Sequence, residues 1–262
     1  MPNIQVQLSK EHLAALAALE ELQNRFFKKL DGYQIPPGET TNKVRVSLAT
    51  CSAAVEYAES VRILCRAGNS MPAQALLRPL QEAWINLAYY LSDEDDTRLN
   101  IATADDIRQI RATAQLLKEY LQANKRERLS RFTVTKLQKI IDAKTKDLEE
   151  ALNDIAEDRI EEFGKDFKLP KLYKRAEIYD KTQKYRSPKN SAYFGYLIVY
   201  RLLSGDVHFG LQALTDWVEF KPGEINLNKG ETQENAQRVV YSAFSLLSDI
   251  VTLTLQEMGI PD

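Results

Sequence analysis

Apolar residues recur at steps of three and four along most of the chain, which is the period of an amphipathic α-helix. The first such segment begins after Ser9, a good helix N-cap, and ends near Gly32. Its apolar positions are Leu13, Leu16, Leu19, Leu22, Phe26 and Leu30. Runs that alternate apolar and polar residues, as strands do, are scarce. The pattern therefore predicts an all-α fold.

The same spacing predicts the rest of the fold. Further helices are expected at 42–67, 71–91, 93–103, 105–123, 133–162, 171–185, 191–218 with an interruption at Gly205, and 232 onward. Pro79 should bend the helix that contains it, and 221–230 should be a loop with at most one short extended piece. We expect residues 1–262 to form a single-domain helical bundle of about eight helices. A long charged helical hairpin, about 105–162, should project from it, with an apolar stripe along 133–162 packed on one side only.

Charge is unevenly distributed although the net charge is only −2. Residues 118–146 hold nine Lys and Arg against three Asp and Glu, and 147–162 hold eight acids and one Arg. Such blocks usually are solvated helix faces that pair with each other, and a docking surface for RNA or another acidic partner is the alternative. A near-neutral chain has no global field that would attract nucleic acid or anionic lipid.

The cysteines and the apolar runs bear on the compartment. Cys51 and Cys65 fall in one predicted helix, about 21 Å apart, so they cannot form a disulfide there. They are expected to be small core residues in a reducing compartment. The N-terminal segment has no apolar signal core, and the most apolar run, 193–200, is too short to cross a bilayer. These features favour a cytoplasmic protein without a membrane segment.

Two predicted helices contain few charged residues, so the charges that they do contain are informative. Between Ala67 and Ser92 these are Arg78 and Glu82, whose four-residue spacing lets them pair. Between Ser191 and Trp217 they are Arg201, Asp206 and Asp216, joined by His208. Because buried ions cost several kcal/mol unless they are paired, these groups are expected to be buried together. The cluster is either a structural salt-bridge network or a site for an anionic ligand.

The segment RLLSGDVH at 201–208 favours the second interpretation. Seven residues make nearly two helical turns, so Arg201 and His208 share one face, about 10 Å apart, with Ser204 between them. A permanently charged guanidinium suits a phosphate, and an imidazole that titrates near neutral pH suits proton transfer. This arrangement favours chemistry on a phosphodiester.

These residues also carry a resemblance to known families. LPKLYKRAEI at 169–178, YLIVYRLLSGDVHFG at 196–210 and LLRPLQEAWINLAYYL at 76–91 resemble a bacterial family known only as a domain of unknown function, over roughly residues 45–255. Its marker residues are Arg78, Glu82, Tyr200, Ser204 and His208 in this sequence. Arg201 and His208, with six residues between them, also resemble the Arg-(four to six residues)-His motif of the HEPN superfamily.

The HEPN resemblance implies a small all-α domain of the kind found in toxins and antiphage systems. It implies a metal-independent ribonuclease in which Arg201 and His208 are catalytic, often in a composite site shared by a homodimer. Arg78, Glu82, Tyr200, Ser204 and Asp206 would support them. The sequence departs from the motif at Leu202, because the position after the Arg is commonly polar.

Other chemistries have little support in the sequence. Two His and two Cys that are not closely spaced argue against a zinc site, and neither a phosphate-binding Gly-rich loop nor a nucleophile elbow is present. No cofactor is expected, and His12 is expected to be solvated. Two hypotheses stay open: a HEPN-like ribonuclease, and a non-catalytic helical module that binds a nucleotide, RNA or a partner protein encoded by a neighbouring gene.

Overall fold

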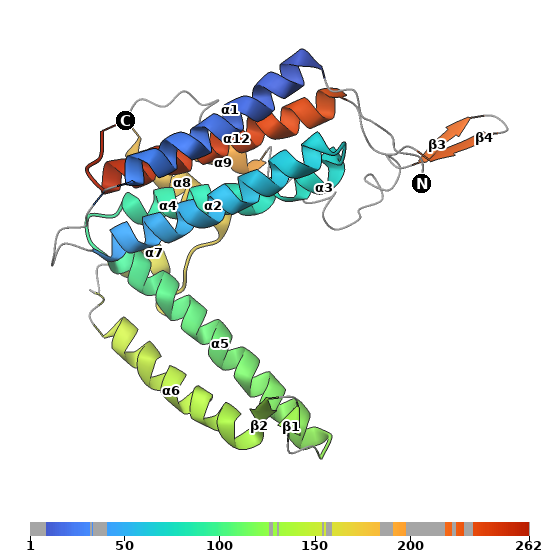
Figure 1. Cartoon of the computed structure of the whole chain (residues 1–262). Helices are drawn as coiled ribbons and strands as arrows, with labels where there is room; N and C mark the ends of the chain where they lie inside the picture. Colours follow the sequence, from blue (N-terminus) through green and yellow to red (C-terminus); the bar gives the residue numbers. More distant parts are fainter. Residues whose placement is uncertain are drawn as a thin grey trace. The chain divides into compact units, whose positions relative to one another are not determined.

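The computed structural model describes residues 9–31, 33, 41–125, 128–129, 131–153, 155, 159–183, 191–197, 218–221, 224–227 and 233–261. The fold is all-α, as the apolar spacing predicts (Figure 1). The helices are α1 (Lys10–Leu30), α2 (Asn42–Arg66), α3 (Ser70–Ala75), α4 (Leu77–Leu91), α5 (Thr97–Ala123), α6 (Val134–Leu152), α7 (Ile160–Phe163), α8 (Leu172–Thr182), α9 (Ala192–Gly195) and α12 (Gln233–Glu257).

Two short antiparallel hairpins accompany the helices. One joins β1 (Arg128–Leu129) to β2 (Phe132–Thr133), and the other joins β3 (Val218–Lys221) to β4 (Glu224–Leu227). The second hairpin falls partly in the predicted loop 221–230, where the sequence indicated one extended piece at most. Neither sheet has more than two strands.

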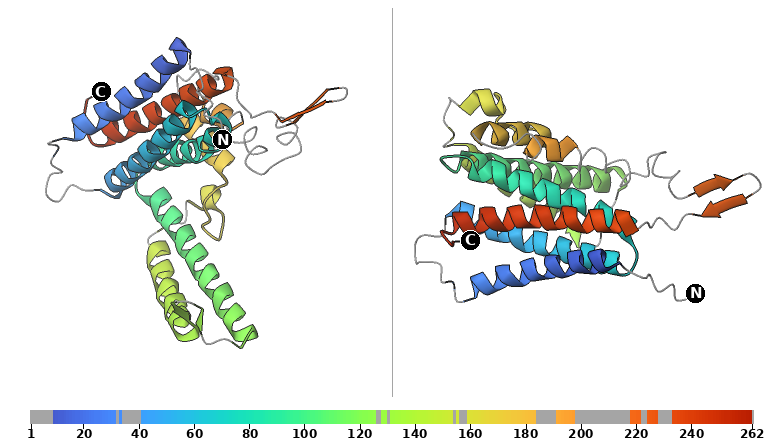
Figure 2. Two further views of the ribbon diagram at one scale, coloured as in Figure 1. Left: turned by 45° about the vertical axis from the view of Figure 1, so that its right-hand side comes forward. Right: turned by 90° about the horizontal axis from the view of Figure 1, so that it is seen from above.

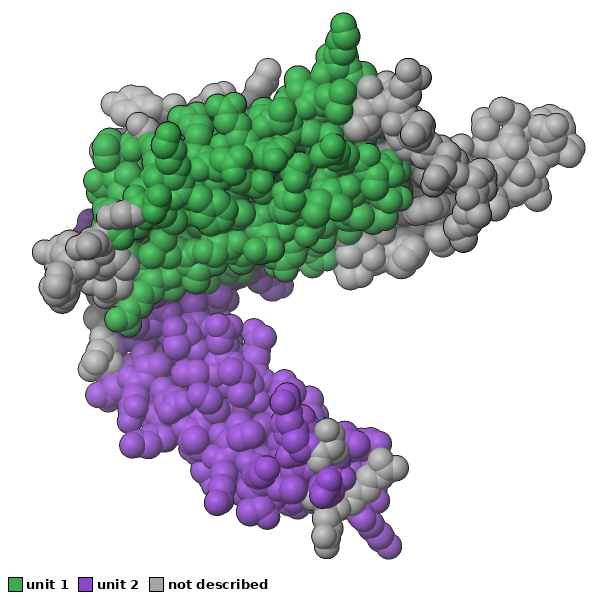
Figure 3. Space-filling view, in the orientation of Figure 1, with its two compact units in different colours: residues 1–92, 172–262 green, residues 93–171 purple. Residues whose placement is uncertain are grey.

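The chain divides into two compact units (Figure 3). Unit 1 contains Met1–Ser92 and Leu172–Asp262, and unit 2 contains Asp93–Lys171. The predicted charged hairpin, 105–162, lies within the second. Sequence pattern alone gave a single domain with an inserted hairpin, and the contacts extend the inserted portion by about ten residues at each end.

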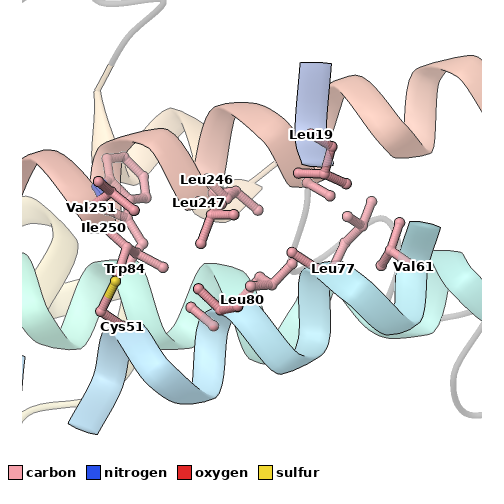
Figure 4. Packing of buried hydrophobic residues seen from close by; sticks show 14 of the residues in the cluster. Leu19, Cys51, Val61, Leu77, Leu80, Trp84, Leu246, Leu247, Ile250 and Val251 are labelled. Carbon is pink, nitrogen blue, oxygen red and sulfur yellow. The ribbon is translucent and has the colours of Figure 1, made fainter. Parts of the chain in front are cut away.

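In unit 1, α12 packs against α1, α2 and α4 (Figures 1 and 2). Its buried apolar stripe interlocks with those of its neighbours (Figure 4). The fully buried side chains in this cluster include Leu19, Leu80, Leu87, Leu247 and Ile250. The C-terminal ends of α1 and α12 lie together, because the Tyr33 hydroxyl donates to the Met258 carbonyl over 3.0 Å. This cluster positions α4, on which the candidate site is built.

The stretch Ala236–Glu257 of α12 is long and apolar enough, by composition, to span a bilayer. Half of its residues are buried inside the protein. The central helix of a folded core meets the same criterion, so this property is weak evidence for a membrane segment. Val240, Leu247 and Ile250, all fully buried, belong to the apolar cluster of unit 1.

Pro79 interrupts the predicted helix 71–91, but the break lies before the proline and not at it. α3 ends at Ala75 and α4 begins at Leu77. Pro79 has no N–H to donate to the Ala75 carbonyl, and its ring would clash with that carbonyl in a continuous helix. The proline therefore sits in the first turn of a new helix, where a missing donor costs nothing.

The extent of α5 differs from what the sequence predicted. The sequence favoured two helices, 93–103 and 105–123. The structure has one unbroken helix, Thr97–Ala123. The Asp105 carboxylate accepts a hydrogen bond from the backbone N–H of Leu169 over 2.7 Å, and Arg108 donates to the carbonyls of Asp166 and Phe167. These side chains tie the chain after α7 to α5.

In unit 2, α5 and α6 pack as an antiparallel pair, the α5–α6 hairpin. The buried residues of the seam near its turn are Ala114, Leu121 and Leu137, with Leu117, Ile140 and Ile141 partly buried beside them. The predicted apolar stripe of 133–162 is therefore the inner face of this pair. It is covered by α5 within the same chain, so it does not by itself indicate a dimer.

A compact ion network joins the start of α5 to α7. Arg98 Nε lies 2.8 Å from Glu162 Oε1, and Arg159 Nη2 lies 3.0 Å from Asp93 Oδ1. The side chains of Arg98 and Asp93 are only 9% and 8% exposed. Burial raises the pKa of Asp93, against the opposing effect of the Arg98 N–H and the two guanidinium groups. The sequence analysis missed this network, because Asp93 and Glu162 fall in strongly acidic runs that look solvated.

His12 is buried and not solvated as predicted. Its side chain is completely inaccessible, and neither ring nitrogen has a hydrogen-bond partner within the described structure. Burial lowers the pKa of the imidazole. The signal was present in the sequence: His12 precedes Ala15, Leu16 and Leu19 by three, four and seven residues, which places it on the buried stripe of α1.

Both cysteines are buried and free, as predicted. Cys51 lies in the apolar cluster of unit 1 (Figure 4). Burial raises the pKa of its thiol to about 12. A thiol that stays protonated is a weak nucleophile and a weak metal ligand, so Cys51 serves as a core residue.

Candidate functional site

The candidate site is built on α4, the most apolar of the described helices around it. Arg78 and Glu82 lie one turn apart, and Arg78 Nε donates to Glu82 Oε1 over 3.2 Å. This is the pair that the four-residue spacing predicts. The side chains are 24% and 39% exposed, so the pair is half-buried. The sequence predicted that it would be fully enclosed. A guanidinium in this position keeps access to solvent and to a ligand.

Asn86 extends the polar face of α4 by one further turn. Arg78, Glu82 and Asn86 follow one another at four-residue steps, which places them along one side of the helix. The Asn86 side-chain oxygen accepts a hydrogen bond from Nη1 of Arg175, on α8, over 2.5 Å. The Nε of Arg175 is buried without a partner in the described part of the chain. Arg78 at one end of this polar stripe and Asn86, which binds Arg175, at the other are about 12 Å apart along the axis of α4.

Gly195 shows where the next segment meets α4. A Cβ at this position would lie 3.1 Å from Gln81 Nε2 and 3.3 Å from Trp84 Cζ3, closer than side chains normally approach. The absence of a side chain lets the backbone of α9 press against α4. Gln81, in the helical turn between Arg78 and Glu82, is 1% exposed, and its Nε2 has no hydrogen-bond partner among the described residues.

Asp180 fixes the entry into this segment. Its two carboxylate oxygens accept hydrogen bonds from the backbone N–H groups of Ala192 and Tyr193, over 2.7 and 2.9 Å. The Ser191 hydroxyl accepts from Phe194 N over 2.9 Å. These contacts satisfy the free N–H groups at the start of α9 and join α9 to the end of α8.

The remaining predicted site residues lie outside the described residues: Tyr200, Arg201, Ser204, Asp206 and His208. Arg201 follows Gly195, which contacts α4, by six residues in the sequence.

Sequence reasoning missed Gln81, Asn86 and Arg175. A signal for Asn86 existed, because it continues the four-residue series that begins at Arg78 and Glu82. Gln81 and Arg175 have no comparable signal, since each becomes informative only when α8 and α9 are seen against α4. In the part of the chain that the structure describes, no three His, Cys, Asp or Glu side chains are grouped to hold a metal ion.

Comparison with known protein families gives a match over most of the chain. The model of a family of unknown function, DUF5677, matches residues 44–225. This range contains α4, α8 and α9, and it also contains the segment 196–210. No curated protein and no solved structure matches the chain.

Proposed function

Because this chain belongs to the DUF5677 family, whose function is unknown, we propose its activity from its own residues: a HEPN-like, metal-independent endoribonuclease of a toxin or antiphage-defence type. Arg201 and His208 are the catalytic residues of this proposal. Arg78 and Glu82 orient them, and Tyr200, Ser204 and Asp206 support them. The two copies of a homodimer would share the site.

One observation supports the proposal more than any other. The segment that leads into Arg201 begins with Gly195 pressed against Gln81, in the same helical turn of α4 that separates Arg78 from Glu82. Gly195, six residues before Arg201 in the sequence, thus contacts the helix that carries Arg78 and Glu82. A purely structural ion pair is either enclosed, or lies at the surface and contributes little to stability. The half-exposed pair of Arg78 and Glu82 fits a binding site better than either of these.

The proposed step balances without a metal or a cofactor. His208 takes the proton from a ribose 2′-hydroxyl, and the 2′-oxygen forms a bond to the adjacent phosphorus. Arg201 stabilises the charged phosphorane with two N–H groups. The bond from phosphorus to the 5′-oxygen then breaks, the 5′-oxygen takes up a proton from solvent, and His208 gives its proton back to solvent. The products are a 2′,3′-cyclic phosphate and a free 5′-hydroxyl.

A second function has a specific observation in its favour. Leu202 stands where active members of the HEPN superfamily commonly have a polar residue. A non-catalytic module would use the same polar stripe, with Arg78 and Arg175, to hold a nucleotide, an RNA or a partner protein. Guanidinium groups suit phosphate recognition in both cases.

RNA cleavage in EDTA separates the two functions. The wild-type chain should cut RNA and leave 2′,3′-cyclic phosphate or 3′-phosphate ends. His208→Ala should lower the rate by about 10²–10⁴-fold, as expected for loss of a general acid or base. Arg201→Lys should also fail, because an ammonium lacks the planar fork of donors. Arg45→Lys, on the exposed surface of α2, is the matched control and should keep full activity.

A second pair of variants tests whether Glu82 positions the catalytic residues. Glu82→Gln should slow cleavage, whereas Glu56→Gln, on the exposed face of α2, should not. Circular dichroism should show that each variant keeps its helix content. RNA binding without cleavage by the wild-type chain, unchanged by His208→Ala, would replace the ribonuclease with the binding module.

A further inference from the structure

The outer face of α5 presents apolar side chains to solvent. Ile110, Leu116 and Tyr120 are 48%, 67% and 47% exposed. At 100° per residue they fall within an arc of about 120° whose centre is Thr113. Asp106, Gln109 and Thr113, in the same arc, are exposed too. The face borders the seam that packs against α6, because Leu117, which packs against that seam, lies about 40° from Thr113.

Charge along the α5–α6 hairpin changes sign from one end to the other. We call its turn region the basic tip, whose exposed cations are Lys125, Arg128, Arg131, Lys136 and Lys139. Residues 128–141 contain no Asp or Glu. We call the opposite end the acidic base, whose exposed carboxylates are Glu94, Asp95, Asp106, Glu149, Glu150 and Glu161.

We propose that the outer face of α5 is a dimer interface, on which the α5 helix of a second copy of this chain lies antiparallel. A two-fold axis beside Thr113 brings the basic tip of each copy over the acidic base of the other. A parallel pair would instead put like charges together. The opposite charges at the two ends of the hairpin therefore favour the antiparallel orientation, with a second copy of this chain as the partner.

The antiparallel register about Thr113 predicts one specific contact across the interface. Asp106 and Tyr120 are each seven residues from Thr113, in opposite directions, and both lie within about 20° of the centre of the face. In the antiparallel pair, Tyr120 of each copy faces Asp106 of the other, and the phenol donates to the carboxylate. Thr113 is small, so the two helices reach the 8–10 Å separation of packed helices at the crossing.

The size of the face sets the expected affinity. A helix of 27 residues is about 40 Å long and about 10 Å wide, which gives roughly 400 Å² per copy. Stable interfaces bury about 800 Å² per partner. The charged ends must therefore contribute much of the attraction, so the dimer should be of micromolar strength and should weaken at high salt.

This interface does not depend on the ribonuclease proposal, and sedimentation tests it without RNA. The 29.9 kDa chain should sediment as a dimer at tens of micromolar in low salt and shift toward monomer in 0.5 M salt. Ile110→Arg should raise the dissociation constant at least tenfold. Ile63→Arg is the matched control, because Ile63 is an exposed isoleucine on α2, at 55% exposure, and outside this face.

A charge-reversal pair tests the orientation. One variant carries Arg128→Glu with Arg131→Glu, and the other carries Glu94→Lys with Asp106→Lys. Each alone should be monomeric, because both ends of its hairpin then have one sign. An equimolar mixture should recover the dimer as a heterodimer.

Four results would overturn the proposal. One is a wild-type chain that stays monomeric at 100 µM in low salt. Another is a dimer that Ile110→Arg leaves intact. The third is a mixture of the two charge-reversed variants that stays monomeric. If Arg128→Glu with Arg131→Glu lost only RNA binding while the dimer persisted, the basic tip would be a nucleic-acid contact and the proposal would fail.

Discussion

The two units are stabilised by different interactions. The apolar cluster of unit 1 draws on α1, α2, α3, α4, α8, α9 and α12, and its central side chains have no contact with solvent. Unit 2 has a narrow seam between α5 and α6, and the start of α5 is fixed by Arg98, Asp93, Arg159 and Glu162. A deep apolar core tolerates the loss of one polar contact, whereas a buried ion network depends on each of its members.

The largest expected effect is in the ion network. Arg98→Ala would leave Asp93 and Glu162 without one of their cations, and breaking a buried pair costs about 3–5 kcal/mol. Hydrogen exchange should speed up through α5 and α7 and leave α12 protected. Lys146→Ala is the control, because Lys146 and its partner Glu150 are 78% and 66% exposed and an exposed pair is worth about 1 kcal/mol or less. Equal effects of the two substitutions would contradict this account of unit 2.

The corresponding test in unit 1 removes a side chain from its apolar core. Leu247 is completely buried, and Leu→Ala at such a position costs about 2–5 kcal/mol, since a cavity is left. Urea unfolding should show this loss, and exchange should speed up in α2, α4 and α12. If α5 and α6 lose protection to the same extent, the two units unfold as one and the comparison between them does not hold.

A smaller effect concerns His12. Its folded-state pKa is lowered by burial, so the folded chain resists protonation. The free energy of unfolding should therefore be highest above the ordinary histidine pKa of about 6.5 and fall as pH drops below it. His12→Leu should remove this dependence and stabilise the chain by about 1 kcal/mol at neutral pH, because two unpaired polar atoms leave the core.

The control for His12 is the other histidine of the chain. His208→Ala should keep the acid-side loss of stability that wild type shows, since His12 is still present. Thermal melts of the three proteins between pH 7.5 and 5 make the comparison. A loss of stability that is identical in wild type and His12→Leu would show that another group titrates.

The helices could be predicted from the sequence because each carries its own apolar period. Their ends were harder. The break before α4 depends on the clash of Pro79 with Ala75, which lies one turn earlier, and the continuity of α5 depends on Asp105 binding Leu169 N from a distant part of the chain. The local sequence shows where Pro79 is but not where the helix breaks before it. It gives no indication that Asp105 binds Leu169 N.

The candidate site was predictable in part for a related reason. Four-residue spacing on a helix gives the pairing of Arg78 with Glu82, because that contact is local. Their exposure depends on which elements cover α4, so the expectation of full burial was wrong. The proximity of Gly195 to Gln81 joins residues more than a hundred positions apart. No pattern in a single sequence encodes such a contact.

The central claim is that α4 and the segment 201–208 form one polar site. The chain has two histidines, so in a His12→Leu background the ring signal of His208 is assigned by NMR without ambiguity. At fixed pH, Glu82→Gln should move that signal clearly, whereas Glu56→Gln should leave it in place. A His208 signal that is the same with Glu82 and with Gln at that position would contradict a shared site.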